Sequence, residues 1–366
     1  MAEAYPLVVI VGPTASGKSA LAIALARQLQ GEVLACDSTQ LYRYVDIGTG
    51  KLAASEQCGI PHHLTDLLES EELSTAGDYQ RRARAVLAEV RSRGRLPIVT
   101  AGTGLYLRAL LEGLSPLPPR APELRARLHK RAEERGSEYL HRLLARVDRA
   151  SARAIAPRDT PKLVRALEVY FSACARGAPA LGWQGGRAGG RQTRTELFAA
   201  GRERLEGYAV TKVGLMPPRA ELYARIEERV ERMLDAGWLE ETRRLRARFP
   251  ACAEASAGRP ACAEASVGRP ACAEASADRP PTPKPFEFLG YRQLLAHLNG
   301  ELPLHQAVKQ IKHETRQFAK RQITWFRKEP GVKWFAGFGD DPTLQVDVAG
   351  YLRGVSLLAN AGRAAD

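Results

Sequence analysis

Residues 12–19 have the sequence Gly12-Pro13-Thr14-Ala15-Ser16-Gly17-Lys18-Ser19, directly after the apolar run Leu7-Val8-Val9-Ile10-Val11. This is the pattern G-x-x-x-x-G-K-[ST] in the context it requires, with a buried strand before it and an Ala- and Leu-rich helix over 20–30 after it. The glycines let backbone N–H groups surround a phosphate group, Lys18 supplies a positive charge, and the Ser19 hydroxyl can reach Mg²⁺. The stretch predicts a phosphate-binding loop, and the alternative is a chance glycine turn.

Strand, turn and helix recur on the C-terminal side of this loop. We expect apolar strands over 32–36 and 96–100, separated by a basic helix over 78–93, and a further strand over 209–215. The strand over 96–100 leads into a glycine turn, Ala101-Gly102-Thr103-Gly104, and another helix. This order predicts an α/β fold with a P-loop core and a parallel sheet, whose ligands bind at the carboxyl ends of its strands.

The composition is that of a globular protein with a basic excess. The 366 residues include 54 Lys and Arg against 41 Asp and Glu, for a net charge of +13, and no run of about 18 apolar residues appears. Three of the six cysteines are copies of one repeat position, and the others are too scattered for a disulfide framework or a zinc site. We therefore expect a cytoplasmic protein with no membrane segment; the basic excess favours a polyanionic partner or merely aids solubility.

The basic residues are concentrated in two regions, which help to set the expected domain boundaries. Residues 120–165 carry thirteen basic and six acidic side chains, and residues 301–333 carry eight and three. We expect a core in two parts, 1–115 and 161–250, with a small helical insertion domain over 116–160. A basic helical region of the core over 284–335 and a C-terminal tail over 336–366 complete the chain.

Residues 251–280 are three tandem copies of a decapeptide, ACAEASAGRP, ACAEASVGRP and ACAEASADRP. A period of ten with one Pro per copy is too short and too weakly apolar to form a solenoid. We interpret 251–283 as a solvent-exposed insertion loop, with a functional arm as the alternative.

The positions of Asp residues relative to the predicted strands indicate which kind of phosphate ligand the loop binds. A nucleoside triphosphatase normally has an Asp at the end of an apolar strand to hold its metal, whereas the strand over 96–100 ends without one. The acid instead follows the second strand, as Asp37. There it suits a metal-linked carboxylate or a general base over the phosphate group, and the alternative is a structural Asx turn.

Several further sequence blocks accompany the phosphate loop at 12–19. They are DSTQLY (37–42), which begins with Asp37, DIGTG (46–50), PHHL (61–64), AGTGLY (101–106), LGYR (289–292) and KRQITWFR (320–327). In this order they resemble the tRNA dimethylallyltransferases, also called tRNA isopentenyltransferases, over nearly the whole chain apart from the repeat and the tail. Ala101 departs from the family's usual Gly, and Gly50-Lys51-Leu52 departs from its commoner Ala-Lys-Pro. No Cys follows Cys272, so the chain is more similar to the bacterial type than to eukaryotic members with a C-terminal zinc finger.

The resemblance implies transfer of a dimethylallyl group from dimethylallyl diphosphate to N6 of the adenosine 3′ to the anticodon, position 37 of tRNA. It implies Mg²⁺ as cofactor, tRNA and dimethylallyl diphosphate as partners, and a monomer as sufficient. If the bound group is a diphosphate that leaves during the transfer, the phosphate loop does not need the strand-end Asp of a nucleoside triphosphatase. Two alternatives stay open: a P-loop small-molecule kinase, and a non-catalytic RNA-binding module with a vestigial nucleotide site.

The resemblance also implies roles for individual residues. Asp37 matches the general base that takes a proton from the adenine amine. Thr103 matches a threonine near the diphosphate and its Mg²⁺, and Ser19 and Thr103 are the expected Mg²⁺ residues. Arg225 matches an arginine that contacts the diphosphate. The alternative for Arg225 is an ordinary solvated position on an amphipathic helix. The expected tRNA contacts are Asp37, Ser38, Thr39, Gln40, Thr103, Arg125, Pro161, Lys162, Leu163, Val164, Arg165, Gly290, Tyr291, Arg292, Lys320, Arg321 and Gln322. Trp325 and Phe326 suit base stacking or, alternatively, a helix core.

Overall fold

The structure is a computed structural model that describes residues 4–115, 117–118, 120–175, 202–249 and 283–355. The chain divides into two compact units. Of the described residues, the core unit comprises 4–111, 204–249 and 283–355, and the helical unit comprises those between 112 and 203. The decapeptide repeat lies outside the described residues.

The core unit is built on a parallel sheet of six strands in the order β3-β2-β4-β1-β5-β6. The strands are β1 (Tyr5–Val11), β2 (Gly31–Cys36), β3 (His62–His63), β4 (Leu96–Ala101), β5 (Tyr208–Leu215) and β6 (Val332–Phe335). In register, Val8 of β1 lies between Ile98 of β4 and Thr211 of β5. The chain order reverses at β1, which makes its carboxyl end the point where parallel α/β sheets bind ligands.

The central strands are apolar throughout because both faces of the sheet are covered. Leu7 to Val11 of β1 are each at most 1% exposed. Their odd and even positions belong to two separate apolar clusters, one on each face. The four strands expected from the sequence are confirmed, whereas the two-residue β3 and the four-residue β6 went unrecognised because they are too short to show a pattern.

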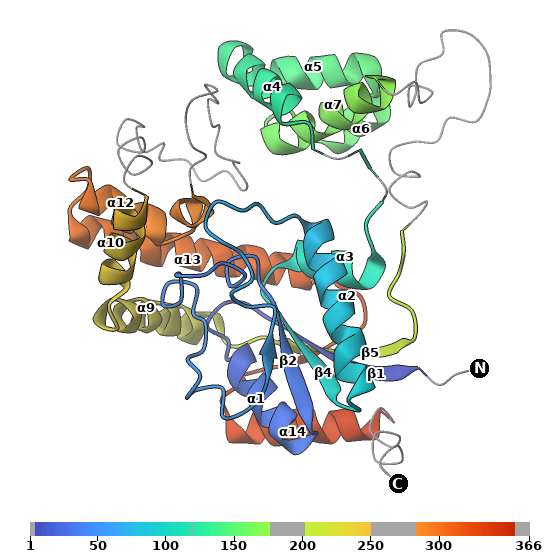
Figure 1. The fold of residues 1–366 in the computed structure, drawn as a ribbon, viewed down its shortest axis with the longest axis vertical. Coiled ribbons are helices and arrows are strands. Elements are labelled where there is room, and N and C mark those ends of the chain that lie inside the picture. Colours follow the sequence, from blue (N-terminus) through green and yellow to red (C-terminus); the bar gives the residue numbers. More distant parts are fainter. Residues whose placement is uncertain (1–3, 116, 119, 176–201, 250–282, 356–366) are drawn as a thin grey trace. The chain divides into compact units, whose positions relative to one another are not determined.

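One face of the sheet is covered by α1 (Lys18–Gln28) and α14 (Pro342–Gly354), which lie together in Figure 1. Leu344, Val348 and Leu352 of α14 are buried against this face. The prediction of a C-terminal tail from residue 336 is therefore wrong for α14, whose apolar positions complete this layer.

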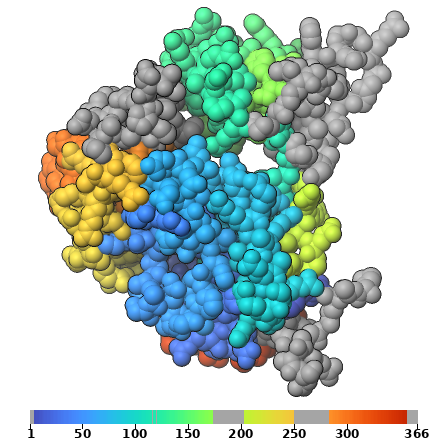
Figure 2. Space-filling model, in the orientation of Figure 1, coloured from blue at the N-terminus to red at the C-terminus, as the bar shows by residue number. Residues whose placement is uncertain are grey.

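The opposite face packs against the remaining helices of the core unit. Its apolar cluster includes buried residues from every one of them. They are α2 (Ala76–Ser92), α3 (Gly104–Glu112), α9 (Arg219–Asp235), α10 (Trp238–Arg248), the 3-10 helix η1 (Lys284–Glu287), α12 (Tyr291–Leu298) and α13 (Leu304–Phe326). Helix α2 begins with a capping box, in which Thr75 and Asp78 satisfy each other's backbone N–H groups. In Figure 2 the blue surface formed by the first part of the chain lies beside the yellow surface of α10, where the Asp46 backbone N–H donates to Glu241.

The helical unit consists, in its described part, of α4 (Pro122–Arg135), α5 (Ser137–Val147), α6 (Arg149–Ala154) and α7 (Thr160–Ala175). Leu140, Leu144, Leu163 and Leu167 form the centre of its separate apolar core. The sequence placed the boundary of this unit at residue 160 and assigned α7 to the P-loop core. That boundary is wrong, because the apolar face of α7 is needed to bury those of α4 and α5.

Candidate active site

The predicted phosphate loop connects the carboxyl end of β1 to α1, as the strand–loop–helix motif requires. Lys18, the first residue of α1, donates from Nζ to the carbonyl oxygens of Gly12 at 2.9 Å and Pro13 at 2.7 Å. Burial lowers the pKa of Lys18 to about 7, against the opposing effect of the Asp37 carboxylate. The ammonium therefore lies inside the loop, where burial favours its neutral form and a nearby negative charge favours its charged form.

Ser16 gives a second indication of ligand binding in this loop. Its side chain is fully buried, and within the described parts of the chain its hydroxyl has no hydrogen-bond partner. A buried hydroxyl without a partner carries a desolvation penalty that a bound oxyanion would remove.

Asp37 directly follows β2, and its two carboxylate oxygens have different surroundings. Oδ1 accepts hydrogen bonds from the Thr39 backbone N–H at 2.9 Å and from the Thr39 hydroxyl at 2.7 Å, which is the Asx turn left open by the sequence. Oδ2 faces Gly102, so closely that a Cβ there would lie 2.5 Å from it. In the described residues nothing donates a hydrogen bond to Oδ2. The carboxylate thus holds its turn with one oxygen and keeps the other available as a base.

Thr103 connects the turn after β4 to the turn after β2. Its Oγ1 accepts a hydrogen bond from the Ser38 backbone N–H at 3.1 Å. The backbone N–H groups of Gly102 and Thr103 both donate to the Cys36 carbonyl at 3.0 Å. The structure therefore brings Asp37, Ser38 and Thr103 together at one edge of the sheet, as expected from strands that end side by side.

Gln322 of α13 joins this edge to the phosphate loop. Its Oε1 accepts from the Thr14 backbone N–H at 2.7 Å, and its Nε2 donates to the Gly102 carbonyl at 2.8 Å. The residue is 6% exposed. Its amide is enclosed and engaged on both sides, and the contact of Gln322 with tRNA stays a prediction.

Arg229, one helical turn after the predicted Arg225, contacts the phosphate loop directly. Its Nη1 donates to the Thr14 hydroxyl at 3.2 Å, burial lowers its pKa, and the Asp37 carboxylate opposes that shift. Arg225 instead forms a two-pronged ion pair with Asp340 and lies 4.2 Å from the centre of the Phe338 ring. Both positions face the same side of α9, and Asp340 itself lies close to Gly17 of the phosphate loop, so the role of Arg225 on the diphosphate stays a prediction.

The remaining predicted tRNA contacts of the core unit divide by exposure. Gly290 and Tyr291 are buried, and their contact with RNA stays a prediction. Gln40 is half-buried, and its amide donates to the Thr49 and Gly50 carbonyls at 3.3 and 3.4 Å. The exposed residues of the set are Arg292, Lys320 and Arg321.

In the helical unit the predicted contacts are also of two kinds. Leu163 and Val164 belong to the apolar core and are not exposed. Arg125 and Arg165 both donate to the buried carboxylate of Glu168, at 2.9 and 2.7 Å. The remaining predictions in this segment are Lys162, which is exposed and paired with Asp159, and the half-buried Pro161.

Exposed aromatic side chains of α13 flank the buried Gln322. Phe318 and Trp325 are 36% and 38% exposed, while Phe326 is buried in the core. The indole of Trp325 packs against Gly104, directly after Thr103, and the Arg108 guanidinium lies 5.0 Å from its ring centre. Trp325 thus presents part of a π-face close to the site, and Phe318 was missed because the sequence could not show which face of α13 is exposed.

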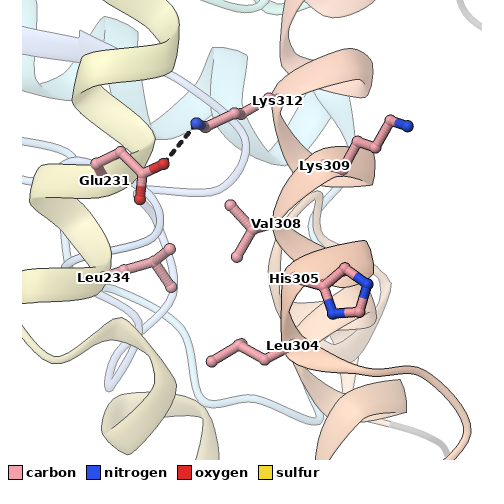
Figure 3. Close-up of a pocket in the computed structure, with 7 residues that line it drawn as sticks. All are labelled: Glu231, Leu234, Leu304, His305, Val308, Lys309 and Lys312. Carbon is pink, nitrogen blue, oxygen red and sulfur yellow. Dashed lines mark hydrogen bonds and ion pairs between the residues drawn. The ribbon is translucent and has the colours of Figure 1, made fainter.

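A groove of about 750 Å³ lies elsewhere, between α9 and the N-terminal half of α13 (Figure 3). Leu234, Val308 and Leu304 point into it, and the ion pair between Lys312 and Glu231, at 2.5 Å, crosses one end. None of the motif residues lines this groove. The candidate site is therefore the edge of the sheet around Lys18, Asp37 and Thr103.

The sequence comparisons agree with one another. A family model described as IPP transferase matches residues 40–329. The tRNA dimethylallyltransferase of Koribacter versatilis is 44% identical to this chain over 338 residues, which are 92% of this chain and 95% of the relative. The enzyme of the same name from Solibacter usitatus is 42% identical over 340 residues, 93% and 95% of the two chains.

Solved structures show the same fold. The crystal structure of a tRNA isopentenylpyrophosphate transferase from Bacillus halodurans has a TM-score of 0.62 and 29% identity, over 98% of both chains. A eukaryotic dimethylallyltransferase described as acting on tRNA has a TM-score of 0.66 at 22% identity, over 96% of this chain and 78% of that one, and shows the fold alone.

Proposed function

The chain belongs to the IPP transferase family, the tRNA dimethylallyltransferases, and on that basis we propose the reaction that its site performs. It is a prenyltransferase that moves a dimethylallyl group from dimethylallyl diphosphate to N6 of the adenosine 3′ to the anticodon of tRNA. The observation that carries the proposal is the placement of the Asp37 carboxylate at the strand end beside the phosphate loop, with Lys18 and Arg229 close to both.

The donor binds by its diphosphate. The backbone N–H groups of the loop, the start of α1, the Lys18 ammonium and the Arg229 guanidinium form a positive cradle for it. As the bond between the allylic carbon and the diphosphate oxygen breaks, the electron pair leaves with the diphosphate. The cations stabilise that developing charge, which is where such groups contribute most to rate.

The acceptor is the exocyclic amine of adenine, which must leave the stacked anticodon loop to reach the site. Its nitrogen forms the new bond to the allylic carbon and gives its proton to Oδ2 of Asp37. A carboxylate that takes this proton makes the amine a better nucleophile. The hydrogen bonds from Thr39 hold the other oxygen and fix the direction of Oδ2.

Mg²⁺ fits the donor set of this site. In the described residues no group of three His, Cys, Asp or Glu side chains could hold a metal, but Mg²⁺ bound through phosphates needs only one or two protein oxygens. The hydroxyls of Ser19 and Thr103 are the residues we propose for it. When bound, the ion supplies charge neutralisation to the diphosphate.

The RNA is recognised by exposed cations and aromatic surface around the site. Lys320 and Arg321 are exposed on α13, next to Phe318 and Trp325. Cations suit the phosphate backbone, and exposed rings suit the unstacked bases of a loop. We extend the proposal to Arg125, Arg165 and Lys162 of the helical unit as the second tRNA-binding region.

No helix among the described residues is long and apolar enough to cross a membrane. A cytoplasmic location and a monomeric state complete the proposal.

The test is to incubate the protein with unmodified tRNA, Mg²⁺ and dimethylallyl diphosphate, and to follow both products. We expect one pyrophosphate released for each N6-dimethylallyladenosine detected by mass spectrometry after digestion. ADP formed from ATP with a small acceptor, and no prenylated nucleoside with several tRNAs, would instead support a kinase.

A further inference from the structure

The loop Asp46–Gly50, which carries the DIGTG block, is held by one carboxylate. Glu241 of α10 accepts hydrogen bonds from the backbone N–H groups of Asp46 at 2.8 Å, Ile47 at 2.9 Å and Gly48 at 3.3 Å. Three backbone donors on one carboxylate form a charge-assisted anchor of the kind that anion-binding turns use. Here the anion belongs to the protein itself, 193 to 195 positions away in sequence.

A tyrosine completes the anchor from another helix. The Tyr291 hydroxyl donates to Oε1 of Glu241 at 2.5 Å and accepts from the Gly48 backbone N–H at 3.1 Å. Tyr291 is fully buried, and burial together with the charge of Glu241 raises its pKa, so it stays a donor. This explains why the LGYR block contains a tyrosine that does not reach the surface.

The other side of the same loop lies against the site. Gly50 has φ +65°, and a Cβ at this position would lie 2.0 Å from Nη2 of Arg229, so only glycine leaves room for the guanidinium. Arg229 in turn reaches the Thr14 hydroxyl of the phosphate loop, and Gln40 donates to the loop carbonyls of Thr49 and Gly50. A shift of the loop would therefore displace both Arg229 and Gln40.

We propose that Glu241, together with Tyr291, is a positioning residue for prenyl transfer: it fixes the Asp46–Gly50 loop as the wall that aligns Arg229 with the phosphate loop. The inference rests on the proposed function, in which Arg229 binds the diphosphate. Glu241 acts through the loop and touches neither substrate.

The experiment measures the affinity of the full chain for inorganic pyrophosphate with Mg²⁺ by calorimetry. Glu241→Gln replaces one acceptor oxygen by a donor and removes the charge, and we expect about tenfold weaker binding. Tyr291→Phe removes only the hydroxyl and is expected to weaken binding in the same direction by a smaller factor. The matched control is Glu240→Gln, the preceding residue on α10, whose carboxylate pairs with the surface residues Arg243 and Arg244; it should bind as wild type.

A double-mutant cycle distinguishes positioning from general loss of structure. If Glu241 acts by aligning Arg229, its effect should be small once the Arg229 guanidinium is gone. In an Arg229→Lys background, Glu241→Gln should therefore weaken pyrophosphate binding by less than about threefold. Full additivity of the two changes, or equal binding by Glu241→Gln and Glu240→Gln, would overturn the inference. Wild-type binding by Arg229→Lys alone would instead overturn the placement of the diphosphate. If Glu241→Gln does not fold, the same cycle with Tyr291→Phe decides.

Discussion

At the residue scale, Asp37 is the residue to which we assign the proton transfer. We expect Asp37→Asn to keep the hydrogen bonds from Thr39 through its amide oxygen and to lose the ability to take a proton. The rate of transfer in a single turnover should fall by roughly 10²- to 10⁴-fold, with the Kd for tRNA changed by less than about threefold. Rapid-quench kinetics measures the rate. Asp347→Asn, at an exposed position of α14, is the control; an unchanged rate in Asp37→Asn would contradict the role.

Lys18 makes binding of the diphosphate dependent on pH. Burial lowers its pKa to about 7, so at pH 8.5 it is mostly neutral in the free enzyme, whereas an adjacent diphosphate raises the pKa and restores the charge. Binding should therefore take up about one proton at pH 8.5, and affinity should fall as pH rises above about 7. Calorimetry of pyrophosphate binding in buffers of different ionisation enthalpy measures the uptake. Lys18→Met should abolish it, and no uptake by wild type would be the contrary result.

At the scale of elements, we assign different tasks to the buried and the exposed face of α13. Its buried face carries Gln322, whose amide links the phosphate loop to the turn after β4. Gln322→Ala should lower the free energy of unfolding by about 1–3 kcal/mol and weaken pyrophosphate binding, because two backbone groups lose a partner. Denaturation and calorimetry test this, with the exposed Gln310→Ala of the same helix as control. Loss of tRNA binding alone, with pyrophosphate binding intact, would contradict this role and favour a direct contact of Gln322 with RNA.

The exposed face of α13 should show two kinds of RNA contact. Lys320→Ala should weaken tRNA binding and reduce the slope of log K against log salt by about 0.7–0.9, as loss of one phosphate contact does. Trp325→Ala should weaken binding by about 1–3 kcal/mol without changing that slope, because stacking is not ionic. Filter binding over a salt series distinguishes them. Arg353→Ala, an exposed cation on α14, is the control, and an equal effect of all three changes would refute the assignment.

The elements also show what the sequence can specify. The phosphate loop, Asp37 and Thr103 were predictable because each follows a strand in a local pattern, and parallel strands end at one edge. The contacts of Arg229, Gln322 and Tyr291 could not be predicted because they span 215, 308 and 243 positions. A helical sequence pattern locates a face of the helix, but which turn of that face meets the loop depends on packing.

For the whole molecule, the decapeptide repeat of 251–280 remains predicted to be an insertion between α10 and η1. Deleting it should leave kcat/KM for tRNA within about twofold of wild type, because loop length alone changes the closure entropy only slightly. Steady-state kinetics and a thermal melt of the shortened chain measure this. A selective rise in KM for tRNA, with pyrophosphate affinity unchanged, would favour the functional arm.

In the proposed reaction, groups at one edge of the sheet join a prenyl group to one adenosine of tRNA. The most direct measurement is to digest tRNA after reaction with isotopically labelled dimethylallyl diphosphate and to map the label by mass spectrometry of the fragments. We predict label on the adenosine 3′ to the anticodon, on its N6, and no label with Asp37→Asn on the same timescale. Label at any other nucleotide, or none on tRNA while the donor is consumed, would contradict the account.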